Sequence, residues 1–471
     1  MQITDNYLQV KHLYHRAGFG LSIQDWNQVM GKNVKKLARE LVRTSQKSAL
    51  EPPLSLTALP VGVGRRQLSE EERKELQKMI RQGVKTLNSA WISHMATSKA
   101  VLREKMTFFW HDHFACRVNS GLMIQQQYRA MKEHALGNFK DLLVAVSQSP
   151  AMLQFLNNQQ NRKGHPNENF ARELLELFTL GRGHYSEQDI KEAARAFTGW
   201  GFNRRDGFVF RQRIHDTGMK EFLGQKGRFG GEDIIRIILE KRQTAYFITE
   251  KLYRFLVNEQ VDSQQVQTWG NHFYDSGYEI ADLLERMLTS DHFYQQVHIG
   301  SRIKSPVEFL VSMMRQLNVA FEEEDAPIIV QRLLGQVLFQ PPNVAGWPSG
   351  RAWIDSSSLM ARLQIPKGLI WGNEFGLASK ASFAGNEDAV QLSRRQSRKL
   401  AAHLDWKPLE KELLASSSEK TLAQAWNFLQ QRPLKAGQLA LIGKTIGNKP
   451  QDQALKLAFM RIMETPEYQF C

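Results

Sequence analysis

The sequence predicts an all-α fold: a multi-helix globular body with one small β-hairpin insertion near residues 202–214 and long ordered loops. Apolar residues recur at helical spacing over long stretches such as residues 121–160. Several expected helix starts carry a serine followed three positions later by an acid, the pattern of a capping box. These pairs are Ser22/Asp25, Ser69/Glu72, Ser186/Asp189 and Ser305/Glu308. Only the segment around Asp206-Gly207, between aromatic flanks, carries a strong hairpin signal.

The N-terminal part is expected to be helical with one long loop. Residues 1–45 should form two helices, separated by the small-residue break at residues 17–20. Residues 50–65 are rich in Pro and Gly and should form a loop. A long helical stretch then follows its serine cap and continues, with a break, to the aromatic cluster at residues 108–110.

The middle of the chain changes character twice. Residues 165–199 read as two helices separated by Gly181-Arg182-Gly183, and a hairpin and a Gly-rich loop follow over residues 201–231. Helices resume from Asp233 to about Met313. Residues 341–350, PPNVAGWPSG, cannot be helical and should form an ordered loop.

The domain organisation follows from these changes in composition. Residues 1–365 are expected to form the main body, with N-terminal helices over 1–100 and a motif-bearing core over 101–365. Residues 366–390 read as a linker, and residues 391–471 as a small C-terminal helical unit.

Composition limits the function classes. The net charge is +14, which favours anionic partners, although the basic residues are dispersed and no helix-turn-helix, zinc-finger or RNA-binding signature appears. Nucleic acid is therefore not the expected partner. The two cysteines, Cys116 and Cys471, exclude a disulfide framework. No leader and no run of about 18 apolar residues is visible, which predicts a cytoplasmic location.

A series of motifs resembles one known family. The motifs are His12-Leu13 with Arg16–Gly20; Arg103–Met106 with Phe109–Phe114; Asn167–Leu174; Leu177–Gly181; Tyr185–Asp189 with Glu192–Trp200; His215–Gly218 with Lys220 and Phe222–Gly224; Lys304–Glu308; and Leu338-Phe339 with Pro341–Pro348. In this order they resemble the DUF1800 family, a bacterial family of unknown function. The resemblance spans roughly residues 10–365. It implies kinship without naming a reaction.

The first candidate site is His111-Asp112-His113. A His-x-His pair can offer two imidazoles to one metal ion. On a continuous helix, however, residues two apart point about 200° away from one another, so both can serve one site only if the helix ends there. The alternative is a pair of structural histidines at a helix end.

The second candidate set follows the Asn167 motif. Arg172 and Glu173 lie on a helix whose other side is apolar, so Glu173 is either a ligand or acid/base group, or one member of an Arg–Glu network. His184 precedes the next helix in a glycine-flanked turn, where it is a candidate metal ligand.

The third set lies in loops. His215, Asp216 and Lys220 fall within six positions, where they could bind a metal, transfer protons or hold an anion, or simply pin the loop. Trp347 and Arg351 could stack on and bind a substrate, or the tryptophan could plug the loop into the body.

Together these residues favour an enzyme, although a binding protein remains open. The expected catalytic residues are His111, His113, Glu173, His215 and Asp216; the expected substrate-binding residues are Arg172, Lys220, Trp347 and Arg351; and the expected ligands of a divalent metal ion are His111, His113, Glu173, His184, His215 and Asp216. The substrate would be an anionic small molecule or polymer, and the reaction a hydrolysis or transfer. The alternatives are a non-catalytic helical binding or scaffold protein and nucleic-acid binding through the basic surface.

Overall fold

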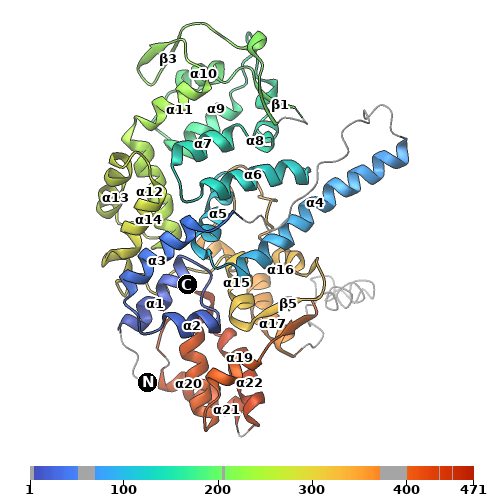
Figure 1. Cartoon of the computed structure of the whole chain (residues 1–471), viewed down its shortest axis with the longest axis vertical. Coiled ribbons are helices and arrows are strands. Elements are labelled where there is room, and N and C mark those ends of the chain that lie inside the picture. Colours follow the sequence, from blue (N-terminus) through green and yellow to red (C-terminus); the bar gives the residue numbers. More distant parts are fainter. Residues whose placement is uncertain (1–4, 51–68, 204–206, 372–399, 434, 448) are drawn as a thin grey trace.

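The computed structural model describes residues 5–50, 69–203, 207–371, 400–433, 435–447 and 449–471 (Figure 1). Most of the loop expected over 50–65 and position 206 of the predicted hairpin turn lie outside these residues. The described chain is mostly helical, with three small two-stranded antiparallel sheets, which confirms the predicted fold class.

The N-terminal segment contains three helices where two were expected. They are α1 (Asp5–Arg16), α2 (Ile23–Val29) and α3 (Val34–Lys47). Ser22 caps α2 as expected by accepting a hydrogen bond from the backbone N–H of Asp25. The extra break comes from Gly31, which has a φ of +85°, and from Asn33, whose side chain caps α3. The expectation of one continuous second helix was therefore wrong.

Helix α4 (Glu70–Thr97) projects from the body (Figure 1). The predicted capping box of Ser69 and Glu72 is present at its start. Described side chains are exposed before Val84, and from there the helix buries residues such as Trp91 against the body.

Helix α5 (Val101–His113) lies in the centre of the molecule and is buried on nearly every side. The neighbouring helices are α6 (Gly121–His134), α7 (Phe139–Ser147) and α8 (Pro150–Phe155). Arg103 holds the backbone carbonyls of Ser45 and Lys132, so α5 connects the N-terminal helices to α6.

A lobe of helices and hairpins covers the far end of the molecule (Figure 1). It contains η1 (Asn158–Gln160), α9 (Asn169–Glu173), the π-helical turn η2 (Leu174–Thr179), α10 (Glu187–Ala196), β1 (Trp200–Asn203), β2 (Gly207–Phe210), η3 (Gln212–Ile214), β3 (Lys220–Phe222) and β4 (Gln225–Gly227). The predicted capping box at Ser186 opens α10. Sequence reasoning predicted two helices over 165–199, but not the π-helical geometry of the first one's end.

The predicted hairpin is the β1–β2 pair, but it is not alone. Its strands pair from Trp200–Phe210 to Asn203–Gly207, and residues 212–214 form a short 3₁₀ turn instead of continuing the strand. The Gly-rich segment expected as a loop forms a second hairpin, β3–β4, because Leu223 and Gly224 both adopt positive φ, as a two-residue turn requires.

The remaining helices complete the body. They are α11 (Gly231–Leu239), α12 (Arg242–Leu256), α13 (Ser263–Asp275), α14 (Ile280–Thr289), α15 (Pro306–Leu317), α16 (Ala326–Leu334) and α17 (Ser356–Trp371), with the short turns η4 (His292–Tyr294) and η5 (Gly350–Trp353). The predicted Ser305/Glu308 box opens α15. The segment between α16 and η5 is an ordered loop, as predicted.

The C-terminal segment packs onto the body. It contains β6 (Ala402–Leu404), α19 (Lys407–Leu413), α20 (Ser418–Leu429), α21 (Ala436–Ile446), α22 (Gln451–Met463) and η7 (Pro466–Gln469). Strand β6 pairs with β5 (Val319–Phe321), and a backbone bridge joins Ile303 to Phe470. Residues 366–371 of the expected linker belong to α17, and the rest of that linker lies outside the described residues.

One continuous apolar core runs from α1 to α22. Within the described ranges, no helix combines the length and apolar character needed to cross a lipid bilayer.

Candidate functional site

The two histidines of α5 point in different directions and are both held by backbone. His111 is 3% exposed, and its Nε2 accepts a hydrogen bond from the backbone N–H of Phe339 at 3.0 Å. His113 is buried, and its Nε2 donates to the carbonyl of Phe178 at 3.1 Å. Burial lowers the pKa of His111 to about 3 and that of His113 well below its usual range. Both imidazoles are therefore neutral at physiological pH.

Asp112 lies between them; it belonged to the candidate motif, but no role was assigned to it from the sequence. Its Oδ1 accepts a hydrogen bond from the backbone N–H of Trp347 at 2.9 Å. The loop approaches so closely that a Cβ at Gly346 would overlap the carboxylate. Burial raises the pKa of Asp112 to about 6, despite the hydrogen bond from Trp347 and the positive charge of Lys251.

Lys251 of α12 is one of the cations whose charge lowers the pKa of this aspartate, together with Arg302. Its Nζ donates to the carbonyl of Leu177 at 3.1 Å, and burial lowers its pKa to about 8 against the opposing effect of Asp112. Each group shifts the pKa of the other toward its charged form, although no ion pair within 4 Å joins these two described residues. Their helices are distant in sequence, so no local motif could have joined them.

Trp347 plugs its loop into the body. The ring is 8% exposed, and its centroid lies 5.4 Å from that of His111. Arg351 is exposed and makes no described side-chain hydrogen bond. Trp347 is therefore packed into the body, which is the second of the two alternatives considered for this residue.

Arg172 and Glu173 lie beside the π-helical turn. The guanidinium of Arg172 donates two hydrogen bonds of 2.8 Å to Glu187 and a longer one to Glu168. Glu173 is half-buried, and burial together with nearby Glu176 raises its pKa. Glu176 itself is bound by Arg182 and by the hydroxyl of Tyr185.

His215, Asp216 and Lys220 pin one loop. His215 donates from Nδ1 to the carbonyl of Thr198 at 2.8 Å. Asp216 is bound by Arg195 through two contacts, and the hydrogen bond from Arg195 is the main cause of its lowered pKa. Lys220 is 2% exposed and donates to the carbonyls of Asp216 and Gly218. Lys220 thus binds the backbone of Asp216, whereas His215 is held by Thr198 and the Asp216 carboxylate by Arg195.

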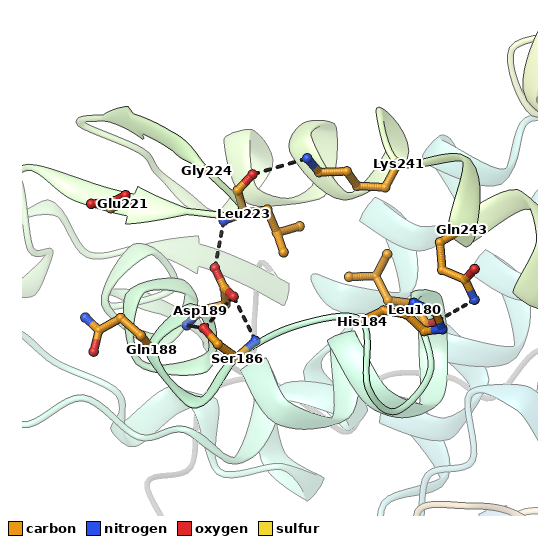
Figure 2. Close-up of a pocket in the computed structure, with 10 residues that line it drawn as sticks. All are labelled: Leu180, His184, Ser186, Gln188, Asp189, Glu221, Leu223, Gly224, Lys241 and Gln243. Carbon is orange, nitrogen blue, oxygen red and sulfur yellow. Dashed lines mark hydrogen bonds between the residues drawn. The ribbon is translucent and has the colours of Figure 1, made fainter.

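His184 borders a different hollow, of about 520 Å³, between the start of α10 and the β3–β4 turn (Figure 2). Asp189 receives the backbone N–H of Leu223 at 2.7 Å, and Lys241 donates to the carbonyl of the same residue at 3.2 Å. Leu223 has a φ of +47°, which is strained for leucine, so this clamp from both sides holds the turn. The polar side chains of Asp189, Lys241 and Gln243 in this lining are thus engaged in hydrogen bonds to the backbone.

The predicted residues therefore lie in separate places. His111 and Trp347 meet at the end of α5, Arg172 and Glu173 lie at the π-helical turn, and His215 lies with its loop partners. Across the described part of the chain, no three His, Cys, Asp or Glu side chains are grouped so as to hold a metal ion. Binding of a divalent metal ion by the predicted residues stays a prediction, because the described residues include no group of side chains placed to hold one.

Comparison with known proteins identifies the family of this chain. The model of DUF1800, described as a protein of unknown function, matches residues 12–470. This chain belongs to the DUF1800 family. Searches of curated proteins and of solved structures found no match. The family match covers the C-terminal helices as well as the motifs recognised in the sequence, whose resemblance reached only residue 365.

One further feature of this DUF1800 protein escaped the sequence motifs: a group of cations around residues 162–165 and 211–215, which we name the cationic rim. A hollow of about 910 Å³ lies beside it, lined by Arg162, His165 and Ile214 among others. The two segments are neighbours because the backbone N–H of Lys163 donates to the carbonyl of Ile214 at 2.8 Å.

The rim carries cations without acidic partners. Among the described residues, no carboxylate forms an ion pair with Arg162, Lys163 or Arg213, and all three side chains are exposed. By contrast, Arg172 and Arg195, in the same lobe, are bound by carboxylates. The individual residues are visible in the sequence, but the folding that brings them together is not.

Proposed function

We propose that this protein binds an anionic polymer along the cationic rim. The single observation that carries the proposal is the set of three exposed cations, Arg162, Lys163 and Arg213, which lack carboxylate partners among the described residues. Arg162 lines the adjacent hollow, and the acid in that lining, Glu168, is paired with Arg172. Unpaired surface cations attract regularly spaced anionic groups, and the net charge of +14 adds a long-range attraction.

An aromatic surface next to the rim supports the same proposal. Phe210 is 46% exposed, and its ring lies 5.1 Å from the ring of His215. An exposed aromatic face beside cations suits a polymer whose units carry both a flat or apolar face and a negative charge.

The affinity should depend on salt because binding releases counterions from the polymer. Three ionic contacts give a slope of about −2 to −3 in a plot of log K against log salt concentration. The slope per contact varies with the charge density of the polymer, so the rim is tested by comparing the variants on the same polymer.

The experiment measures binding of dextran sulfate, polygalacturonate and single-stranded poly(U), with uncharged dextran as the reference, between about 50 mM and about 200 mM salt. The test variant replaces Arg162, Lys163 and Arg213 with glutamine. The control variant removes the same charge from Arg236, Arg242 and Arg254, whose guanidiniums are bound by carboxylates.

The test variant should lose most of the affinity and of the salt slope, while the control variant should keep both. Equal losses in the two variants would mean that net charge alone attracts the polymer. Absence of binding to every anionic polymer would reject the proposal, and preference for poly(U) would favour the nucleic-acid alternative.

A second candidate function is acid–base catalysis of a hydrolysis or transfer reaction, favoured by Asp112 and Lys251. Both groups have pKa values displaced toward neutrality and keep partly exposed edges. Such displaced pairs are enriched at catalytic sites. If Asp112→Asn abolishes hydrolysis of a polymer that still binds, catalysis is supported; if it alters stability alone, the non-catalytic binding alternative gains.

A further inference from the structure

A hollow of about 920 Å³ lies between the N-terminal helices and the layer of α4, α15 and β5. Its walls come from α1, α2 and α3 on one side and from α4, α5, α15, β5 and α16 on the other. None of the residues predicted from sequence lines it, and it is separate from the cationic rim.

One wall of the hollow is apolar. Val29, Leu37 and Leu41 come from the N-terminal helices, and Val101 and Met314 come from the body. Each is packed against the core on its inner side and leaves only a narrow edge toward the hollow. A hydrocarbon chain would cover these edges and remove them from water, which is the main source of affinity in such sites.

The lining of the hollow also includes polar side chains and carboxylates. Tyr14, Asp25 and Glu40 all line the hollow. Burial raises the pKa of Tyr14 to about 12, and the negative charges of Asp25 and Glu40 act in the same direction. The Tyr14 hydroxyl has no hydrogen-bond partner among the described residues, and Glu40 forms no described ion pair.

The buried arginine that lines the hollow does not present a free positive charge. Arg315 binds Asp25 at 2.8 Å and also donates to the carbonyls of Met95, Ala96 and Ser98. Its Nη donors are therefore committed to α4 and α2, and the charge is balanced by Asp25. What remains open near Tyr14 is the carboxylate of Glu40.

The charge around the hollow runs against that of the whole chain. Four acids line it, namely Asp25, Glu40, Glu323 and Glu324, against the three cations Lys32, Lys99 and Arg315. With Asp25 and Arg315 paired, the exposed lysines are outnumbered by three glutamates. A protein of net charge +14 thus keeps a locally acidic, partly apolar hollow.

We propose that this hollow binds a lipophilic ammonium compound, that is, a positively charged nitrogen attached to a short hydrocarbon. The nitrogen lies at Tyr14 and Glu40, where it meets an aromatic ring and a carboxylate. The hydrocarbon lies along the edges of Val29, Leu37 and Leu41. This site is independent of polymer binding at the rim.

Three probes with the same hydrocarbon and different charges test the proposal: octylammonium, octanol and octanoate, each titrated calorimetrically. Octylammonium should bind about tenfold or more tightly than octanol, because the head group adds a carboxylate contact and a cation–π contact of about 1.4 kcal/mol or more together. Octanoate should bind more weakly than octanol.

Two variants locate the head group. Glu40→Gln should weaken octylammonium about fivefold and leave octanol unchanged, because a partly exposed ion pair contributes up to about 1 kcal/mol. Tyr14→Phe keeps the ring and should retain most of the affinity, while Tyr14→Leu should lose it. The matched control is Glu133→Gln on α6, which changes the net charge equally and does not line the hollow.

Equal affinities for the three probes, tighter binding of octanoate, or the same loss in Glu133→Gln as in Glu40→Gln would each overturn the proposal. Absence of any octylammonium binding would do the same. Melting curves of the variants show that they are folded, so a loss of binding cannot be attributed to unfolding.

Discussion

At the residue scale, α5 shows why two neighbouring histidines form no common site. The helix continues through His113, so residues two apart face opposite sides, as the helical repeat requires. His111 therefore meets Phe339, and His113 meets Phe178. From the sequence, the two histidines could either share one site or take separate structural positions. The position of the helix end decides between these alternatives.

Asp112 gives a prediction about pH. Its pKa is raised to about 6 in the folded protein, from an ordinary value near 3.8. The folded state therefore holds this proton more tightly than the unfolded state, and stability falls as the pH rises from about 4 to about 6. Asp112→Asn keeps an acceptor for Trp347 and removes this dependence.

The Asp112→Asn variant should be more stable than the parent protein by about 3 kcal/mol well above pH 6, with the difference vanishing near pH 4. Urea unfolding at several pH values measures this. A variant that is less stable at every pH would show that the carboxylate stabilises the loop more than its burial costs.

At the element scale, the π-helical turn η2 depends on side chains from other helices. Its geometry leaves carbonyls near its end without the usual helical partners. His113 binds the carbonyl of Phe178, Lys251 that of Leu177, and Gln243 that of Leu180. A π-helical turn has no simple signature in one sequence, which is why it was expected as an ordinary helix.

Lys251→Met tests this support. It retains much of the side-chain volume and leaves the Leu177 carbonyl without its donor, which should cost about 1–3 kcal/mol of stability. The control is Lys226→Met, whose exposed ammonium forms only a surface ion pair with Glu221 and should change stability little. Equal melting temperatures for Lys251→Met and the parent protein would contradict this role.

At the scale of the whole molecule, a buried basic centre joins distant parts of the chain. Burial alone would raise the pKa of Glu308, but Arg302 and Lys105 lower it to about 2. Lys304 donates to the carbonyl of Tyr468 at 2.8 Å, and Tyr468 donates to Gln316 at 2.6 Å. These contacts attach the C-terminal helices to α15.

Tyr468→Ala should therefore destabilise the whole protein. It removes a fully buried aromatic ring and a buried hydrogen bond, at a cost of about 3–5 kcal/mol. We expect a single unfolding transition, shifted to lower denaturant, in both tryptophan fluorescence and circular dichroism. The exposed Leu441→Ala is the control. Two separate transitions would instead indicate that the C-terminal helices unfold alone.

Local patterns in the sequence predicted much of the fold, but not its long-range pairings. The serine caps of α2, α4, α10 and α15 and the β1–β2 hairpin rest on residues close in sequence. The three-residue strands β5 and β6 pair across about eighty positions and carry no local signal. The cationic rim was missed for the same reason, because its two segments are joined only by folding.

The projecting helix α4 also ties the surface to the interior. A helix of 28 residues is about 42 Å long, and its inner half carries Trp91, whose ring lies 5.4 Å from both His111 and Phe339. A partner that binds the outer half of α4 would contact the helix whose inner half packs against His111, and His111 in turn packs against Trp347. The same helix therefore offers an exposed surface at one end and forms part of the packing around His111 at the other.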